Sequence, residues 1–314
     1  MVTKMRWKYT SLLLSSLLLF SGVSGCSLDF SASQKKVGQV ESIDKSSIEY
    51  VVKGKGDTTI VFVHCWTCNR TFWDAQVNYF AQKYQVISLD LAGHGKSTSK
   101  REDYTISAFG QDVVSVIEDV GAKQVILVGH SMGGPVAIEA AKILENKTST
   151  NNSPVIGIVG VDTFYTSFQY PKTTEEIANF TKSFENNFQK TSDNLIRSMF
   201  TKEADPKLVD SIANTMTNAE PKMAVSAISQ ILVWKAEKET ADLQKFSNRL
   251  RNINAAPTGQ EKPLHESVVL VKNVGHFLPQ VKPEEFNQIL DSVIADLSRK
   301  PIAKRVKVAD RIND

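Results

Sequence analysis

The chain has 314 residues, of which 41% are apolar and 23% are charged, and this is enough to bury one large core. Its formal charge of +3 comes from Lys4, Arg6 and Lys8, because the rest of the chain carries equal numbers of basic and acidic residues. Nucleic-acid binding needs a basic surplus, so this balance argues against a nucleic-acid partner.

The first 25 residues have the pattern of a secretory signal peptide. The three cations precede a Leu- and Ser-rich segment at 11–20, which is too short to span a bilayer. Small residues then lead to Cys26, and this ending resembles the lipobox of bacterial lipoproteins. The resemblance implies that Cys26 carries acyl chains at a membrane surface. The alternative is an ordinary signal peptide with an incidental cysteine.

The same resemblance implies export across the bacterial inner membrane, to the periplasm, the outer membrane or the cell surface. Ser27 follows the cysteine in place of an aspartate, which in Gram-negative lipoproteins favours the outer membrane. Residues 26–38 are rich in Ser, Gln and Lys, and they are predicted to form a flexible tether. A folded domain is expected to begin at residue 39.

The first part of this domain, 39–163, alternates strand and helix patterns. Alternating apolar residues at 40–43 and 48–53 predict an antiparallel hairpin. Two short apolar runs around a segment of helical period then predict a βαβ unit, and hence a parallel sheet with right-handed crossovers. The strands of this unit are predicted at 59–63 and 84–89, its helix at 71–82, and a further amphipathic helix at 106–120.

The segment with the most chemical content is a strand, a sharp turn and a helix. Val125–Val128 is an apolar, β-branched run typical of a buried parallel strand, and a helical pattern begins at Pro135. Between them, Gly129, Ser131 and Gly133 form the G-x-S-x-G pattern of a nucleophile elbow. The glycines permit a turn tight enough to hold the serine in a strained, accessible conformation. The alternative is a serine that only caps the helix.

Beyond a strand at 155–161, the pattern changes to helices. Residues 164–246 show no strand pattern, so an inserted helical domain is expected there. Strand and helix patterns return at 247–297, and the cation-rich residues 298–314 predict a solvated basic tail. The inserted helices are predicted at 174–188, 193–200, 205–216 and 221–237, and the later elements are strands at 249–253 and 266–274 and a helix at 283–297.

Four motifs occur in the order that one known family uses. They are His64-x-Trp66 after a strand, Asp90-x-x-Gly93-His94-Gly95-x-Ser97, Gly129-His130-Ser131-Met132-Gly133-Gly134 and the late Gly275-His276-Phe277. With these motifs the chain resembles an α/β-hydrolase over about Ile60–Leu297. The resemblance implies a mostly parallel central sheet flanked by helices, with 164–246 as a helical cap over the active site. It implies no metal and no organic cofactor.

The predicted cap carries eight large apolar side chains that could line a substrate pocket. Because most aromatic residues at helical spacing belong to the core, about three of the eight are expected to face substrate. The eight are Phe164, Tyr165, Phe168, Tyr170, Met199, Phe200, Met216 and Trp234.

A serine hydroxyl is a weak nucleophile at neutral pH and needs a base within hydrogen-bond reach. His276 is the best candidate, because it follows the serine in chain order and lies in the loop where the family's base falls. His64 and His94 are expected to brace loops, and His130 is expected to point away from substrate. His265 lies in a polar loop and is expected to be solvated.

The reaction also needs N–H donors for the tetrahedral oxyanion. The resemblance implies Met132, the residue after the serine, as one donor and Trp66 as the other. The family usually has Gly where this chain has Cys65, and a Cβ there is expected to tilt the loop or narrow the pocket. In an oxidising compartment Cys65 and Cys68 could form a disulfide, and a redox-active Cys-x-x-Cys is the alternative.

The family usually supplies the carboxylate that orients the base after its seventh strand, but residues 252–257 contain no acid. Asp162 ends the strand at 155–161, a position that some family members use, and it is the first choice. Glu261, a few residues past the seventh strand, is the second. A capping role at the entry to the cap is the alternative for Asp162.

These features together predict a lipid-anchored serine hydrolase, of which a carboxylesterase acting on a small ester-like substrate is the leading form. Ser131 would attack the carbonyl and form an acyl-enzyme, and His276 would take and return the proton. Two rival interpretations remain. One is another serine chemistry, on lactones, amides or carbon–carbon bonds, and the other is a non-catalytic, membrane-tethered binding protein.

Overall fold

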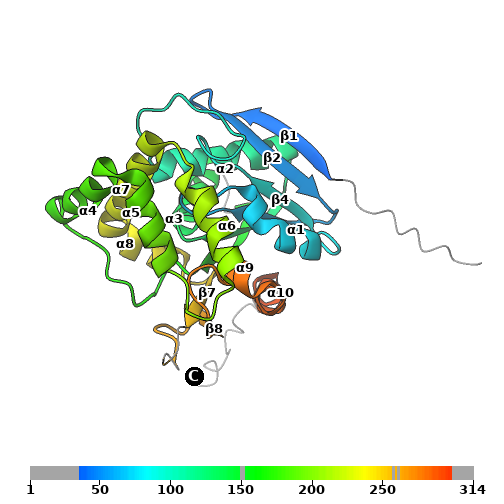
Figure 1. Cartoon of the computed structure of the whole chain (residues 1–314). Helices are drawn as coiled ribbons and strands as arrows, with labels where there is room; N and C mark the ends of the chain where they lie inside the picture. Colours follow the sequence, from blue (N-terminus) through cyan, green and yellow to red (C-terminus); the bar gives the residue numbers. More distant parts are fainter. Residues whose placement is uncertain (1–34, 149–152, 257–258, 260–261, 299–314) are drawn as a thin grey trace, which may run out of the picture. The chain divides into compact units, whose positions relative to one another are not determined.

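The computed structural model describes residues 35–148, 153–256, 259 and 262–298. Within them lie the strands β1 (Lys36–Glu41), β2 (Ser47–Lys53), β3 (Thr58–Val63), β4 (Gln85–Leu89), β5 (Gln124–His130), β6 (Val155–Val161), β7 (Leu250–Ala256) and β8 (Val268–Lys272). They form one sheet in the order β1-β2-β4-β3-β5-β6-β7-β8 (Figure 1). The β1–β2 hairpin joins antiparallel to β4, and β3 to β8 run parallel. This arrangement confirms the predicted mostly parallel sheet.

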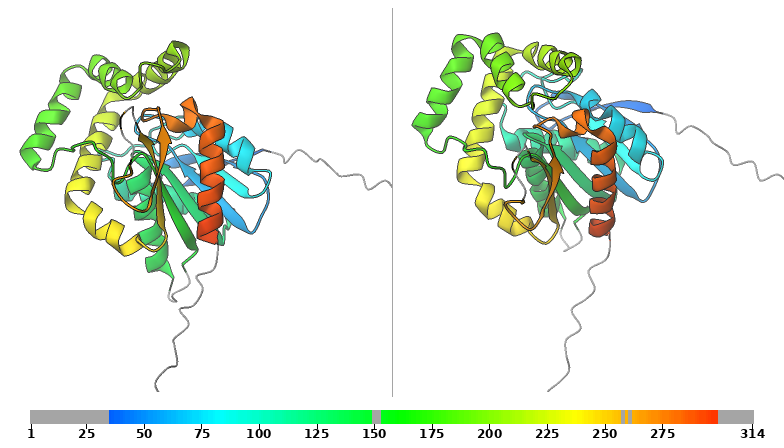
Figure 2. Two further views of the ribbon diagram at one scale, coloured as in Figure 1. Left: turned by 90° about the horizontal axis from the view of Figure 1, so that it is seen from below. Right: turned by 60° about the horizontal axis from the view of Figure 1, so that its bottom comes forward.

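Helices cover both faces of the sheet. Successive residues of a strand point to opposite faces, so the apolar side chains on each face need a layer of helices to bury them. In β3, Ile60 and Phe62 pack into the core of one face, and Val61 and Val63 pack into the core of the other. The first face carries η1 (Arg70–Trp73), α1 (Asp74–Phe80), α9 (Leu278–Val281) and α10 (Pro283–Ser298), and the second carries α2 (Ile106–Val120) and α3 (Gly133–Lys147) (Figure 2).

Five helices between β6 and β7 form the cap, and their side chains meet the carboxyl end of the sheet at a shared cavity. Local sequence fixes where several of them begin. Thr173 and Glu176 form a capping box, and Glu220 caps the helix that starts at Pro221. The five are α4 (Thr174–Asn186), α5 (Phe188–Ser198), α6 (Pro206–Thr217), α7 (Pro221–Glu237) and α8 (Glu239–Phe246), drawn in green to yellow in Figure 2.

Two cap helices differ from the prediction. The sequence predicts a helix only from residue 193, whereas α5 begins at Phe188 because the Asn187 side chain accepts the Lys190 N–H as an N-cap. The buried side chains of α5 recur every four residues, but most residues of the helix are polar. The sequence therefore shows no apolar period, and the buried side becomes evident only in the packed cap. The short helix α8 was not predicted at all.

The hairpin also begins earlier than the sequence predicts. β1 starts at Lys36 instead of residue 40, so residues 36–38 belong to the sheet and not to the predicted tether. Its side chains are exposed or half-buried, so pairing with β2 holds the strand, and no apolar alternation marks residues 36–38 as its start. Tyr50 packs on Gly38, where a Cβ would lie 2.2 Å from the ring.

Several predicted features lie outside the described residues. They are the signal peptide at 1–25, the lipidation site Cys26, most of the tether, the alternative acid Glu261 and the tail beyond Ser298. None of the helices that the structure does describe combines the length and the apolar character needed to cross a membrane.

Candidate active site

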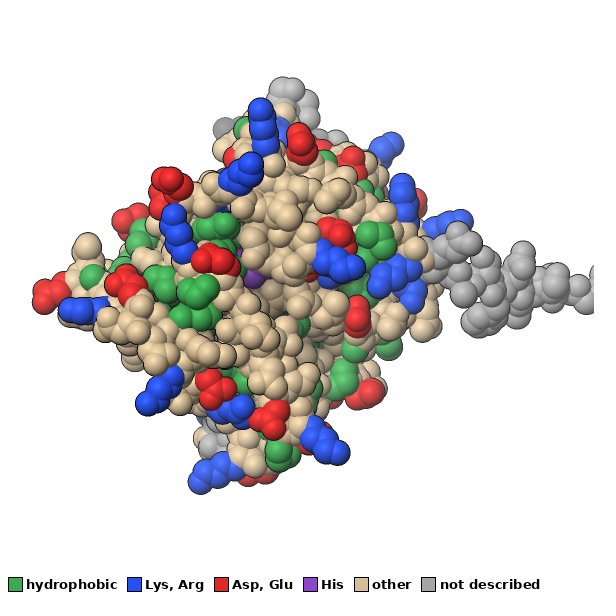
Figure 3. Space-filling model, turned by 45° about the horizontal axis from the view of Figure 1, so that its top comes forward, with side chains coloured by type: hydrophobic (Ala, Val, Ile, Leu, Met, Phe, Trp, Pro, Cys, Tyr) green, Lys and Arg blue, Asp and Glu red, His purple; other side chains and the backbone are tan. Residues whose placement is uncertain are grey.

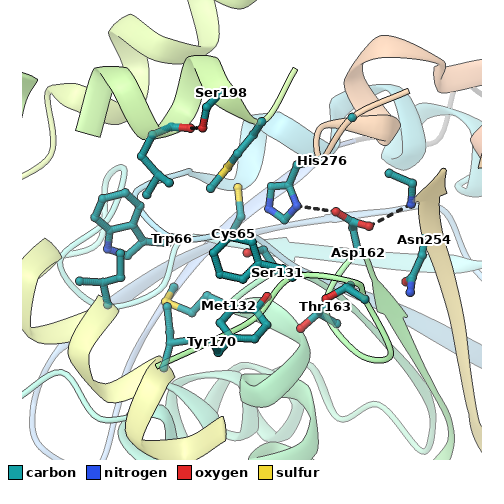
Figure 4. Close-up of a pocket in the computed structure, with 18 of the residues that line it drawn as sticks. Cys65, Trp66, Ser131, Met132, Asp162, Thr163, Tyr170, Ser198, Asn254 and His276 are labelled. Carbon is teal, nitrogen blue, oxygen red and sulfur yellow. Dashed lines mark hydrogen bonds and ion pairs between the residues drawn. The ribbon is translucent and has the colours of Figure 1, made fainter. Parts of the chain in front are cut away.

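The carboxyl ends of four parallel strands meet at one edge of the sheet. The loop after β3 carries Trp66, β5 leads to Ser131, β6 leads to Asp162, and the loop after β8 carries His276. All four residues line one cavity of about 380 Å³ under the cap (Figure 4). The structure therefore brings together residues that the sequence distributes over separate motifs.

Ser131 occupies a strained turn between β5 and α3, with a backbone φ of 52°. A left-handed conformation is costly for a residue with a Cβ, so its surroundings must hold it. The Ser131 N–H donates to the Val161 carbonyl of β6 at 2.9 Å. A Cβ on Gly129 would lie 2.0 Å from the Gly133 carbonyl oxygen, and one on Gly133 would lie 2.3 Å from that of Val63. These close approaches explain why glycines flank the serine.

Asp162 holds the imidazole of His276. His276 Nδ1–H donates to Asp162 Oδ2 at 2.6 Å, and the Ala255 N–H of β7 donates to Oδ1 at 2.9 Å (Figure 4). Thr173 caps α4, so Asp162 does not serve as the N-cap of the first cap helix. Because the carboxylate is an acceptor, the proton of a neutral imidazole lies on Nδ1, and Nε2 is left as the base.

The loop that carries His276 is held from two sides. His130 Nε2–H donates to the His276 carbonyl at 2.9 Å, and the His276 N–H donates to the carbonyl of Met199, just after α5, at 2.9 Å. Burial keeps the pKa of His130 well below its ordinary value, so this ring is neutral. His130 therefore braces the base from the protein interior. Within the described residues the Ser131 hydroxyl has no hydrogen-bond partner. In ligand-free enzymes the hydrogen bond between such a hydroxyl and its base often forms only when substrate binds.

His64 orients the peptide group that carries the Trp66 N–H. Its Nε2 accepts the Leu91 N–H at 3.0 Å, so its proton lies on Nδ1 and is donated to the Cys65 carbonyl at 2.8 Å. Burial lowers the pKa of His64 to about 4 and so keeps the ring neutral. In a trans peptide the Trp66 N–H points opposite to that carbonyl. Across the described residues, neither this N–H nor that of Met132 has an acceptor, so both can serve an oxyanion.

The cavity is lined by six of the eight predicted pocket residues, which is more than the three expected. Phe164 and Trp234 are the exceptions, because both pack in the interior between the cap and α3. The Trp234 indole N–H donates to Glu139 of α3 at 2.8 Å, and the Phe164 ring is fully buried. On the face shown in Figure 3, apolar side chains lie beside a recess in which a histidine is visible. The six lining residues are Tyr165, Phe168, Tyr170, Met199, Phe200 and Met216.

Two histidines outside the base loop test the remaining expectations. His94 braces its loop as predicted, because its Nδ1–H donates to the Ala92 carbonyl at 3.1 Å. The prediction for His265 was wrong. Its ring is half-buried, stacks on Tyr165 at 4.0 Å with 7° between the planes, and bonds to the Ser267 hydroxyl at 2.8 Å. The polar sequence around His265 does not indicate this contact, because the partner ring belongs to Tyr165 at the entry to the cap.

Lys235 of α7 is a cavity residue that the sequence analysis missed. Its side chain is only 5% exposed, and Nζ donates to the Thr163 carbonyl and to Glu239, each at 2.8 Å. Nζ also lies 4.2 Å from the centre of the Tyr170 ring, and burial lowers the pKa of this lysine. The lysine thus fixes the backbone directly after the acid. A cation at the end of the apolar run Ile231–Trp234 was the available indication.

Cys65 and Cys68 form a disulfide, which is one of the two alternatives left open by the sequence. Both residues are buried, and Cys65 lines the cavity. The cysteine that stands in place of the family's usual glycine is therefore tied back by a covalent bond within its own loop.

A strand, a left-handed serine and a helix, with an imidazole supplied later in the chain, define an enzyme fold with a nucleophile elbow. The comparison with protein families agrees with this description. The model of the alpha/beta hydrolase family matches residues 60–289, and the chain belongs to that family.

Curated relatives match only part of the chain. It is 33% identical over 100 residues to a bifunctional esterase/perhydrolase from Acinetobacter calcoaceticus, which covers 31% of this chain and 36% of the relative. It is 35% identical over 97 residues to a non-heme chloroperoxidase from Burkholderia pyrrocinia, covering 30% and 35%. The matched region thus spans about a third of the length of these relatives.

Solved structures match over most of the described fold. A thermophilic esterase from Thermogutta terrifontis has a TM-score of 0.68 at 18% identity, covering 83% of this chain and 99% of the other. A bromoperoxidase from Bacillus anthracis has a TM-score of 0.68 at 23% identity, covering 83% and 100%. At these identities the likeness shows the fold alone.

We expect the free energy of unfolding to fall as the pH drops from 7 to 5. Burial lowers the pKa of His64 to about 4 and that of His94 to about 3, whereas an unfolded histidine titrates near about 6.5. Below that pH the unfolded chain binds protons that the folded chain excludes. Stability is therefore complete above about pH 6.5 and is lost as the pH falls, by about 2 kcal/mol per histidine at pH 5. Urea unfolding at a series of pH values measures this slope.

A single variant isolates the share of one buried histidine. His94→Asn keeps a donor for the Ala92 carbonyl and should reduce the slope by the share of one histidine. A free energy of unfolding that stays constant between pH 7 and pH 5 would contradict the expectation.

Proposed function

We propose that this α/β-hydrolase is a serine hydrolase of the carboxylesterase type. The observation that carries the proposal is the hydrogen bond between His276 Nδ1 and Asp162, at the cavity that Ser131 also lines. In the proposed reaction Ser131 Oγ attacks the ester carbonyl carbon and His276 Nε2 accepts its proton. Asp162 stabilises the imidazolium that forms.

The N–H groups of Trp66 and Met132 stabilise the negative charge of the tetrahedral intermediate. When the intermediate collapses, the alcohol leaves with the proton from His276, and the acyl group remains on Ser131. Water then attacks by the same route, and the carboxylic acid departs. These steps use three side chains, those of Ser131, His276 and Asp162, together with two backbone N–H groups and one water molecule.

The cavity favours an ester with an apolar group of small or medium size. Its volume of about 380 Å³ is near the lower end for ligand sites, and the cap contributes apolar side chains such as Phe180, Leu195 and Ile228. Lys235, the cation among the lining residues, already has two hydrogen-bond partners. A panel of p-nitrophenyl esters, lactones and amides would separate ester hydrolysis from the other serine chemistries.

Labelling with a fluorophosphonate probe tests the nucleophile. We expect the intact chain to bind the probe covalently at one site, because an activated serine attacks phosphorus as it attacks a carbonyl carbon. Mass spectrometry of the digested protein should place the probe on Ser131, and Ser131→Ala should remain unlabelled. A folded chain that neither labels nor hydrolyses any ester of the panel would be a binding protein instead.

Asp162→Asn should lower kcat by about three to four orders of magnitude, because an amide facing Nδ1 favours the wrong tautomer of His276. Steady-state kinetics with the best ester of the panel measures this loss. Glu261→Gln removes the rival acid and should leave kcat within about twofold of the original value. The reverse result would assign the orienting role to Glu261.

We also propose that the protein is exported and lipid-anchored through Cys26, which the sequence of residues 1–26 supports. Cells grown with a palmitate analogue should incorporate it into the chain, and the chain should sediment with membranes. Cys26→Ala should abolish the incorporation. Equal incorporation into Cys26→Ala would rule out this anchor.

A further inference from the structure

The disulfide closes a four-residue turn that contains the proposed oxyanion donor. Cys65 and Cys68 flank Trp66 and Thr67, and the Cα atoms of the two cysteines lie 5.2 Å apart. The Cys68 N–H donates to the Cys65 carbonyl at 3.2 Å, which makes the segment a hydrogen-bonded β-turn. The turn is thus closed twice, once by a hydrogen bond and once by a covalent bond.

Thr67 stands in this turn in an unfavourable conformation. Its φ is 54°, in the left-handed region where glycine is the usual residue and a β-branched side chain is rare. It is also 4% exposed, and within the described residues its hydroxyl has no hydrogen-bond partner. A residue with both a strained backbone and a buried, unpaired hydroxyl changes its conformation unless its neighbours hold it. The covalent bond between the residues on either side is the strongest available restraint.

The peptide group between Cys65 and Trp66 transmits this restraint to the cavity. Its carbonyl accepts hydrogen bonds from His64 Nδ1 at 2.8 Å and from the Cys68 N–H at 3.2 Å. The N–H on the opposite side of the same plane is the proposed donor. A rotation of the turn that breaks the second of these bonds would therefore also turn the N–H of Trp66.

The side chain of Trp66 is anchored separately. Its indole N–H donates to the Ala224 carbonyl of α7 at 2.8 Å, and its ring packs edge-on against Phe184 and Phe188. Loss of the disulfide would therefore leave the indole and the apolar wall of the cavity in place. Only the backbone of the turn would be released.

We propose that the Cys65–Cys68 disulfide is a positioning element of the oxyanion hole, which holds Thr67 left-handed and so aims the Trp66 N–H at the reacting carbonyl. This inference rests on the proposed function. Oxyanion donors act because they are preorganised, and a displaced donor loses most of its effect on the transition state while substrate binding is little changed. A glycine at position 67 would adopt this backbone conformation freely. Here the covalent bond between Cys65 and Cys68 holds a threonine in it instead.

The test is the double variant Cys65→Ala/Cys68→Ala in the full chain, with an ester that the original protein hydrolyses. We expect kcat per titrated active site to fall by about tenfold or more, while KM stays within about twofold. The affinity for a trifluoromethyl ketone, which forms an oxyanion on the serine, should fall in parallel with kcat. A four-residue loop adds little chain entropy, so the thermal midpoint should change by no more than about 5 °C.

A rescue distinguishes positioning from a general structural role. Adding Thr67→Gly to the double variant should restore part of kcat, because glycine adopts positive φ without a covalent restraint. Thr67→Val keeps the β-branch and should restore nothing. If glycine restores no more than valine, the loss does not act through the conformation of the turn, and the inference is overturned.

The remaining outcomes separate this inference from the proposed function. If the original chain, with its disulfide verified by mass spectrometry, neither labels nor hydrolyses esters, the proposed function fails. If it is active and the double variant keeps kcat and ketone affinity, only the positioning role fails. Loss of activity that merely follows loss of folded protein, as measured by circular dichroism, would also overturn the positioning role.

Discussion

The carboxylate of Asp162 is the group on which the rest of the site depends. It follows β6, accepts an N–H from Ala255 in β7 and binds the imidazole of His276, which is delivered after β8. Its own backbone is left-handed, with φ of 44°, and Lys235 bonds to the carbonyl of the next residue. Because both oxygens of the carboxylate are committed, the position of the base is set by the register of three neighbouring strands. A shift in any one of them would separate the base from its partner.

The cap is hydrogen-bonded to two of the residues that line the site. It accepts a hydrogen bond from the indole of Trp66 through Ala224, and one from the backbone of His276 through Met199. A cap that moved away as a rigid body would break both bonds, one at the loop that carries Trp66 and one at His276. The contacts that shape the apolar wall of the cavity therefore also position the polar groups around Ser131. The shape of the cavity and the placement of the groups around Ser131 are therefore linked through the cap.

Much of the fold could be predicted from local patterns, and the exceptions have a common cause. The helix at 106–120 and the strand at 155–161 have the predicted bounds, because each buries a continuous stripe or run of apolar side chains. β1 and the start of α5 were misplaced because pairing with a neighbour strand and an N-cap determine them, and neither leaves an apolar period. His265 was misjudged for a similar reason, since its partner Tyr165 comes from a distant segment.

The sequence by itself determined the order of the motifs, the serine in its glycine-flanked turn and the choice of one histidine among five. The glycine-flanked turn depends on steric rules that act within a few residues, whereas the histidine was chosen by its place in the order of motifs that the family resemblance supplies. Only the tertiary structure decided that Asp162 meets a histidine 114 residues away and that Cys65 bonds to Cys68. Both outcomes depend on distances between side chains. Those distances are fixed by strand order and loop packing, and no local pattern encodes them.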